Sequence, residues 1–308
     1  MMTLLVTGAS GFIGNAVLRA LGQSPFKVHA VCSHRKPEID DSITWHQTNL
    51  LDPEKVSQLF SDIKPEYLIQ LAWCTGQGSY WSDPANLDWI SANLVIAKNF
   101  AKNGGSRCLF AGTSAEYDWK GNEPLNELTT PLNPLLLYGG SKLASYWALT
   151  RYFEQVNISF TWTRFFNPFG EGEDYRRLIP KTCMRLLNGE DLSFDAALSL
   201  RDFLHVSDVG EAVVSLIKSN ITGPVNIGSG EALSVQQVIT TIAENYNRSN
   251  QVKFARPETA AGIPDSVVAN THRLNIECGW QPEKAFRERI NETCKWWKNQ
   301  HKKLINEK

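Results

Sequence analysis

The chain has 308 residues and a net charge of −1, and 42% of its residues are hydrophobic while 20% are charged. This length exceeds that of a typical single domain, so we expect one large α/β domain and a smaller second one. The charge balance excludes electrostatic recognition of nucleic acid or of an anionic membrane surface, and no apolar run reaches the roughly 18 residues of a membrane span. Without a signal peptide or a C-x-x-C pair among the six cysteines, the sequence predicts a cytoplasmic protein with reduced thiols and no metal site.

The first predicted element is a strand that turns into a helix. Residues 4–14 read LLVTGASGFIG, and an apolar helical pattern follows over residues 16–21. Glycine permits positive φ and lets the backbone approach a phosphate, while the unpaired N–H groups of a helix start favour an anion. The G-x-x-G-x-x-G spacing, which differs from the commoner G-x-G-x-x-G fingerprint, thus indicates a dinucleotide site. An ordinary strand–turn–helix connection is the alternative.

The second predicted strand, residues 27–32, bears on the choice of cofactor. It leads into Ser33 and Arg35, where a dinucleotide-binding fold faces the adenosine ribose. No acidic residue follows before Glu38, whereas an arginine accommodates the 2′-phosphate of NADP. The sequence therefore favours NADP, with NAD as the alternative if Arg35 is only a solvated loop charge.

Three more strands are predicted, at residues 43–47, 67–72 and 108–112, and helical patterns alternate with them. One helix is expected to start with Asp52 as its N-cap, and another covers residues 86–101. This alternation predicts an α/β fold with a Rossmann-like, doubly wound parallel sheet. Ligands bind such sheets beyond the carboxyl ends of the strands.

Three side chains form a candidate catalytic group. Thr113 follows the fifth strand, and Tyr138 and Lys142 stand four residues apart at the start of a helical pattern, so they share one helix face. A nearby ammonium, aided by an oxidised nicotinamide, favours the phenolate and lowers the pKa of a phenol from its usual value of about 10 toward neutrality. Such a tyrosine can exchange a proton with a ketone or alcohol oxygen while a hydride moves at the carbon. A pair on an inert helix surface is the alternative.

The combined motifs resemble those of the extended short-chain dehydrogenases/reductases, in the branch of nucleotide-sugar epimerases, dehydratases and 4-ketoreductases. The likeness covers about residues 3 to 300 and continues through residues 164–170, 201–209, 226–230 and 278–282. It implies that Tyr138 is the general acid/base, that Lys142 binds the nicotinamide ribose, and that Thr113 holds the reacting oxygen, with Ser114 as its rival. The cofactor-binding residues expected from the glycine turn and the resemblance are Gly8, Ser10, Gly11, Phe12, Ile13, Ser33, Arg35, Asn49, Leu50, Leu71, Ala72, Trp73, Tyr138, Lys142 and Phe165. At position 49 the family more often has Asp.

The resemblance also implies a division of the chain. Residues 1–168 would form the NAD(P)-binding Rossmann domain, to which some later segments return, and residues 169–308 would mainly form a smaller α/β domain that binds the nucleotide-sugar. The substrate-binding residues expected are Thr75, Ser114, Asn167, Arg177, Arg201 and Arg256. Guanidinium groups suit phosphates, although each arginine has a surface charge or an ion pair as its alternative. For Arg201 that pair would be with Asp202 or Asp208.

The sequence also predicts the roles of one histidine and several tryptophans near the site. We expect His205 to be a packed structural histidine. Trp73 and Trp81 are expected to line the sugar pocket, and Trp89, which follows the helical pattern, is expected in the core.

The expected reaction is the NADPH-dependent reduction of a 4-keto-6-deoxy nucleotide-sugar. Dehydratases of the family usually have an Asp-Glu pair directly after the strand-end threonine, and here Thr113 is followed by Ser114, Ala115 and Glu116. An NAD(P)-dependent 4-epimerase that uses the same residues is the alternative. A non-catalytic NADP-binding regulator is less favoured, because the chain keeps both Tyr138 and Lys142. The resemblance further implies a homodimer through the helices near 86–101 and 138–153.

Overall fold

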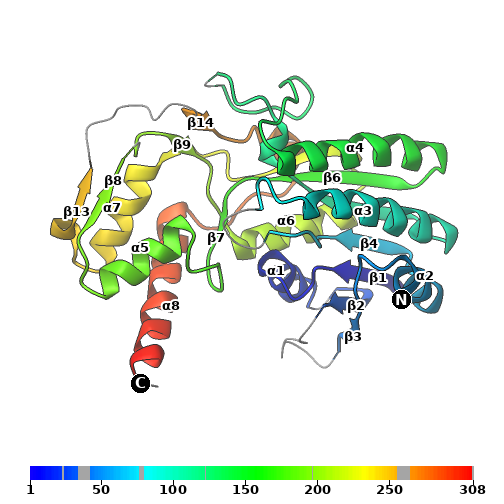
Figure 1. The fold of residues 1–308 in the computed structure, drawn as a ribbon, viewed down its shortest axis with the longest axis horizontal. Coiled ribbons are helices and arrows are strands. Elements are labelled where there is room, and N and C mark those ends of the chain that lie inside the picture. Colours follow the sequence, from blue (N-terminus) through cyan, green and yellow to red (C-terminus); the bar gives the residue numbers. More distant parts are fainter. Residues whose placement is uncertain are drawn as a thin grey trace.

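A seven-stranded parallel sheet forms the larger body of the protein (Figure 1). The computed structural model describes residues 1–22, 24–33, 42–75, 80–121, 123–195, 197–254 and 264–306. The strand order is β11-β6-β5-β4-β1-β2-β3, and all neighbouring pairs are parallel. The strands are β1 (Met2–Thr7), β2 (Phe26–Cys32), β3 (Thr44–Gln47), β4 (Tyr67–Gln70), β5 (Arg107–Thr113), β6 (Ser159–Phe165) and β11 (Gly223–Ile227). The predicted doubly wound sheet is confirmed, and its order reverses between β1 and β4, where such sheets bind ligands.

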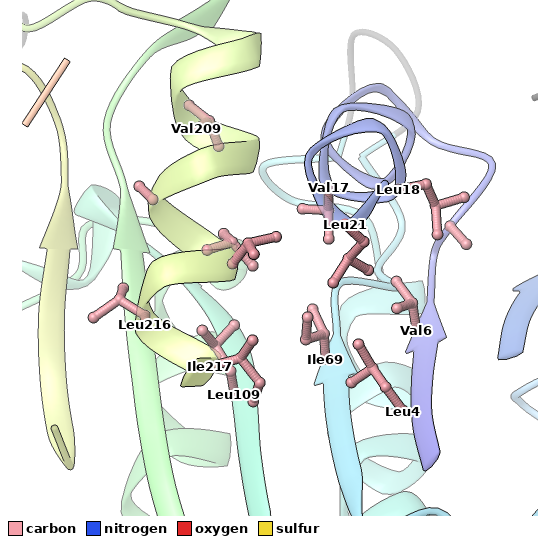
Figure 2. Close-up of a cluster of buried hydrophobic side chains, with 14 of the residues drawn as sticks. Leu4, Val6, Val17, Leu18, Leu21, Ile69, Leu109, Val209, Leu216 and Ile217 are labelled. Atoms are coloured by element: carbon pink, nitrogen blue, oxygen red, sulfur yellow. The ribbon is translucent and has the colours of Figure 1, made fainter. Parts of the chain in front are cut away.

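Helices cover both faces of this sheet. The first face carries α1 (Phe12–Leu21) and α6 (Val206–Lys218), and the second carries α2 (Pro53–Ile63), α3 (Ala85–Lys102) and α4 (Leu137–Gln155). Figure 2 shows the first face, where side chains of α1 and α6 meet those of the central strands. Because successive strand residues point to opposite faces, Leu4 belongs to this cluster and Leu5 to the cluster of the second face. Burial on both faces explains the continuous apolar runs of the sequence.

Local signals place several element boundaries. Helix α2 begins as predicted, because the Asp52 side chain accepts hydrogen bonds from the N–H groups of Glu54 and Lys55 and proline occupies the first helical position. The predicted strand 67–72 is too long: β4 ends at Gln70. The Gln70 side chain accepts a hydrogen bond from the Ala72 N–H at 3.0 Å, so the backbone turns away from the sheet and leads into the ligand edge.

Most of the second half of the chain forms a smaller lobe, which lies at the left of Figure 1. Its helices are α5 (Leu178–Leu187), α7 (Val235–Asn245) and α8 (Phe286–Asn306), which surround a separate apolar core. Short strands form three small sheets: β7 (Pro168–Phe169) with β10 (Leu204–His205), β8 (Leu192–Phe194) with β13 (Val252–Phe254), and β9 (Leu200–Arg201) between β12 (Leu233–Ser234) and β14 (Ser266–Val267). Helix α6 and strand β11 come from this half of the chain but belong to the larger body. A domain boundary at residue 168 stays a prediction.

Three short helical turns complete the fold, namely η1 (Ser114–Glu116), η2 (Ser249–Gln251) and η3 (Arg273–Glu277). Within the described ranges, no helix has both the length and the apolar character needed to cross a bilayer.

Candidate functional site

The turn between β1 and α1 is shaped by close backbone packing. Gly8 has a φ of +63°, and a Cβ atom there would lie 2.7 Å from the backbone nitrogen of Ala72. A Cβ atom on Gly14 would lie 2.7 Å from the Cα atom of Ala9 and would also overlap the Gly8 carbonyl oxygen. No side chain caps the start of α1 at Gly11, so the first N–H groups of the helix remain available to an anion. This cradle fits the pyrophosphate of a dinucleotide.

A cleft of about 770 Å³ opens above this turn at the carboxyl edge of the sheet. It is lined by most of the residues predicted to bind cofactor: Gly8, Ser10, Gly11, Phe12, Ile13, Ser33, Asn49, Leu50, Leu71, Ala72, Trp73, Tyr138, Lys142 and Phe165. It is also lined by Thr113 and by four of the predicted substrate residues: Thr75, Ser114, Asn167 and Arg177. Segments far apart in the sequence therefore meet in one cavity large enough for an extended ligand.

Of the three remaining predicted arginines, the structure describes only Arg201. Arg35 and Arg256 lie outside the described residues. Arg201 is not among the lining residues, and its guanidinium donates hydrogen bonds to the carbonyl oxygens of Leu200 and Pro264 at 2.7 and 3.0 Å.

Arg201 does not form the ion pair with Asp202 or Asp208 that is the alternative to its predicted substrate-binding role. The Asp202 carboxylate instead accepts hydrogen bonds from the N–H groups of Ser229 and Gly230, and Asp208 pairs with Arg289. The Asp202 side chain thus ties the β9 segment to the loop after β11, and both acidic residues expected to pair with Arg201 have other partners.

Thr113 and Tyr138 meet at one end of the cleft. The Thr113 hydroxyl lies beside the Tyr138 phenol and acts to lower its pKa, and it accepts a hydrogen bond from the Ala115 N–H at 3.2 Å. The Thr113 N–H donates to Glu116 Oε1 at 2.8 Å. Glu116 is itself fully buried and accepts from Arg164 Nε at 2.7 Å. A buried ion pair between η1 and β6 therefore fixes the strand-end hydroxyl beside the phenol.

Burial dominates the electrostatics of Tyr138 and Lys142. It raises the pKa of the Tyr138 phenol, an effect that Tyr80 reinforces and the Thr113 hydroxyl opposes. It also lowers the pKa of Lys142 from 10.5 to about 7, although Glu116 acts in the opposite direction. The lowering of the Tyr138 pKa by Lys142 together with an oxidised nicotinamide stays a prediction, and burial is the largest effect on the phenol in the protein itself. A low-dielectric site disfavours the charged forms of both groups.

The Lys142 ammonium has two close partners. Its Nζ atom donates a hydrogen bond to the carbonyl oxygen of Ala111 at 2.6 Å and lies 3.9 Å from the centroid of the Trp73 ring. Lys142 and Tyr138 both line the cleft, as their spacing on one face of α4 predicts.

Aromatic side chains enclose Tyr138. The rings of Tyr80, Trp81 and Trp73 approach its ring in edge-to-face geometry, with centroids 5.1, 5.5 and 6.5 Å away. Trp73 and Trp81 line the cleft as expected. Trp89 packs against the core as expected and also lines the cleft, because it stacks on Trp73. The reacting end of the cleft is therefore largely apolar.

Sequence reasoning missed several residues of the cleft, and Glu173 is the one with the most perturbed carboxyl. Glu173 lines the cleft, and burial raises the pKa of its carboxyl to about 8 against the effect of Arg177. Oxygen Oε2 of Glu173 has no hydrogen-bond partner among the described residues. Glu173 does not stand in a recognisable motif, because a loop brings it to the site. Tyr80, which belongs to the aromatic stretch expected at the sugar pocket, also lines the cleft. His205 is packed as expected: it is buried, with Nδ1 2.8 Å from Ser207 Oγ and Nε2 3.0 Å from Glu171.

Comparison with known proteins places the chain among nucleotide-sugar enzymes of the same fold. The profile of the NAD dependent epimerase/dehydratase family matches residues 4–228. The dTDP-4-dehydro-6-deoxyglucose reductase of Escherichia coli is 24% identical over 95% of this chain and 96% of its own length. Two solved structures have the same fold. The UDP-glucose 4-epimerase of Thermotoga maritima, determined with UDP-glucose, has a TM-score of 0.86 and 22% identity over 97% of this chain and 99% of that one. The UDP-glucose 4-epimerase of Thermus thermophilus, a complex with NAD, has a TM-score of 0.83 and 24% identity over 96% of this chain and 99% of that one.

Proposed function

Because the chain belongs to the NAD dependent epimerase/dehydratase family, we propose that it is an enzyme that uses NADPH to reduce a 4-keto-6-deoxy nucleotide-sugar. The observation that carries this proposal is the meeting of the Tyr138 phenol, the Thr113 hydroxyl and the Lys142 ammonium at one end of the glycine-lined cleft. A reductase with this chemistry is similar to the chain over nearly its full length.

In the proposed reaction, NADPH bound in the cleft would supply the hydride for C4 of the sugar and would leave as NADP⁺. Thr113 holds O4 in place, and Tyr138 gives its phenolic proton to O4 as the C4–O4 double bond becomes a single bond. The buried Lys142 ammonium stabilises the phenolate that remains. Tyr138 then recovers a proton from solvent before the next turnover. Ser114 lines the same end of the cleft and is the alternative holder of O4.

Two features favour reduction over dehydration and NADP over NAD. The acidic residue after Thr113, Glu116, is bound to Arg164 and excluded from solvent, so it has no free oxygen for the additional acid/base steps of a dehydratase. Arg35 suits a 2′-phosphate on the basis of the sequence alone. NAD is the alternative cofactor, since the Thermus thermophilus epimerase structure contains it. We assign Asn167 and Arg177 to the phosphates of the nucleotide-sugar.

The second candidate, a 4-epimerase, is favoured by the similarity to the two UDP-glucose 4-epimerases. The two activities differ in net chemistry, because an epimerase returns the hydride to the sugar. Purified protein is therefore exchanged into cofactor-free buffer and given NADPH with a panel of 4-keto-6-deoxy nucleotide-sugars and UDP-hexoses. Stoichiometric NADPH oxidation supports the reductase. If the protein instead retains its nicotinamide, interconverts 4-epimers and consumes no net NADPH, the protein is an epimerase and the reductase proposal is wrong.

The role of Tyr138 is tested by Tyr138→Phe, which removes only the hydroxyl. We expect turnover to fall by about 10²- to 10⁴-fold, the usual contribution of a general acid, with little change in NADPH affinity. Tyr152→Phe on the same helix is the matched control. Unchanged turnover in Tyr138→Phe would assign the proton transfer to another group. If the unsubstituted protein turned over no keto-sugar of the panel, the non-catalytic NADP-binding regulator would become the favoured reading.

A further inference from the structure

Lys142 is buried with few partners for its charge. Lys142 is only 3% exposed. Within the described ranges, no carboxylate forms an ion pair with its Nζ atom. Glu116, the acidic group that acts on it most, is bound to Arg164. Burying an ammonium is unfavourable unless other groups offset the lost hydration. A single carbonyl oxygen, that of Ala111, does so only in part.

The face of Trp73 supplies the second partner. The indole ring is the best aromatic acceptor of a cation, and the interaction strengthens when both groups are removed from water. The 3.9 Å between Nζ and the ring centroid places the ammonium in direct contact with the π face. Trp73 also contacts the ring of Tyr138 edge-on, so the indole touches both members of the catalytic pair.

Trp73 is held in this orientation from two further sides. Its Nε1 donates a hydrogen bond to Asn86 Oδ1 at 2.8 Å, and its ring stacks on Trp89 with an interplanar angle of 28°. Asn86 is completely buried and donates from Nδ2 to the carbonyl oxygens of Tyr80 and Asp83 at 2.7 and 2.8 Å. The start of α3 therefore orients the indole before any ligand binds.

We propose that Trp73 is a positioning residue, whose indole face, oriented by Asn86, holds the Lys142 ammonium beside Tyr138 in the cleft. The assignment deepens the proposed function, because it concerns the lysine of the same site. It does not depend on which nucleotide-sugar reaction the enzyme catalyses.

The charge state of Lys142 reports on this contact. The titratable groups that act on the amine are Glu116 on η1 and Cys74 after β4, and Tyr138 stands one turn away on the same helix. None of them is removed in a Trp73 variant, so the loss of the indole acts on the ammonium directly. We expect the titration midpoint of Lys142 to fall by about one pH unit in Trp73→Leu, a tenfold change in its protonation equilibrium. The shift in Trp73→Phe should be smaller, because a phenyl face remains.

The experiment is NMR of the protein with ¹³C-labelled lysine, recorded without cofactor or substrate. One lysine signal should show an upfield ring-current shift at its ε position and should disappear in Lys142→Met, which assigns it. In Trp73→Leu the ring-current shift should vanish and the midpoint should fall, whereas Trp81→Leu, which removes a ring that contacts Tyr138 from another side, should leave both unchanged. An unshifted signal in the unsubstituted protein, or an unchanged one in Trp73→Leu, would overturn the proposal.

Two further variants and one assay complete the test. If Trp73→Leu does not fold, Trp73→Phe and Asn86→Ser give the same two readouts with smaller changes of volume. In the activity assay, the alkaline limb of the pH profile of kcat should move to lower pH in Trp73→Phe. If the NMR shifts appear and no reduction is found, the proposed function fails while the positioning role stands. If reduction is found but the NMR shifts do not appear, the positioning role of Trp73 is wrong and the proposed function stands.

Discussion

At the scale of single residues, the cleft combines buried titratable groups from different elements. Lys142 comes from α4 of the larger body, and Glu173 comes from the loop between β7 and α5. Burial lowers the pKa of Lys142 to about 7 and raises the pKa of Glu173 to about 8. Both groups therefore change charge near neutral pH, where small changes in their surroundings decide which form is present.

Glu173 gives a prediction for stability. Its pKa in the folded protein, about 8, exceeds the ordinary value of 4.5, so the folded state binds more protons than the unfolded state between these two pH values. Its contribution to stability is present in full below about pH 4.5 and is lost as the pH rises through 8. The free energy of unfolding should fall by up to about 1.4 kcal/mol per pH unit over this window.

Glu173→Gln should abolish this dependence, because an amide does not titrate. Urea unfolding of both proteins at pH 5, 6, 7 and 8 measures it, and the variant should gain stability relative to the parent as the pH rises. Asp174→Asn changes the neighbouring, half-buried carboxylate, which pairs with Arg176 at the surface, and should alter stability by less than about 1 kcal/mol. Parallel stability curves for the parent and Glu173→Gln would contradict the assigned pKa.

At the scale of elements, the turn between β1 and α1 uses its glycines for different purposes. Gly14 lies where a Cβ atom would overlap backbone atoms of Gly8 and Ala9, whereas a Cβ atom on Gly11 would meet only the Gly8 carbonyl oxygen at 3.2 Å. Gly14 thus allows helix and turn to pack, and Gly11 keeps the start of the helix open to a ligand.

Substitutions separate these two purposes. Gly14→Ala should reduce stability by about 1–3 kcal/mol, the usual cost of overpacking, and weaken dinucleotide binding as well. Gly11→Ala should leave stability within about 1 kcal/mol while raising the Kd for NADPH, since a methyl group intrudes where the phosphate approaches. Thermal unfolding and calorimetric titration of both variants measure the two effects. Equal losses of stability would contradict the distinction.

Arg107 at the start of β5 stabilises the end of another element. Its guanidinium donates to the carbonyl oxygens of Ile217 at 2.9 Å, Leu216 at 2.6 Å and Ile221 at 3.0 Å. These carbonyls lie at and just beyond the last turn of α6, where carbonyl groups lack partners within the helix. One buried side chain thus joins α6 to the sheet.

Arg107→Met should lower the free energy of unfolding by about 2–3 kcal/mol, because it leaves buried carbonyl groups without donors. Urea denaturation measures the change. Arg151→Met, which removes an exposed pair with Glu154, is the matched control and should cost less than about 0.5 kcal/mol. Similar losses in the two variants would show that α6 does not depend on this cap.

At the scale of the whole molecule, α3 and α4 pack side by side on one face of the sheet (Figure 1). Each leaves a large apolar side chain uncovered: Leu87 is 53% exposed and Trp147 is 58% exposed. We propose that this pair of helices forms the interface of a homodimer, as the family resemblance implies.

Trp147→Asp should convert the dimer to a monomer, because it places a charge in an apolar interface. Light scattering coupled to size-exclusion chromatography measures the mass. Tyr175→Asp, at a side chain that is 63% exposed in the smaller lobe, is the control and should keep the dimer. If the unsubstituted protein is a monomer in solution, the proposed dimer interface is wrong.

The cofactor edge of the fold could be predicted from the sequence because its signals are local. The glycine turn, the Asp52 cap and the four-residue spacing of Tyr138 and Lys142 depend on backbone geometry within a few residues. The alternation of strands and helices then predicts which strand ends share an edge. Together with the family resemblance, this reasoning predicted most of the residues that line the cleft.

Only the tertiary structure decided which groups became partners across the chain. Glu116 pairs with Arg164, Lys142 contacts Trp73, and Arg201 bonds backbone carbonyls instead of the predicted carboxylates. These partners are brought together by packing between elements, for which local spacing carries no information. The same holds for the pKa values of Tyr138 and Lys142, since burial depends on the complete fold. The sequence by itself determined the sheet, the cradle and the catalytic residue types, and the packed cleft decided their contacts and charge.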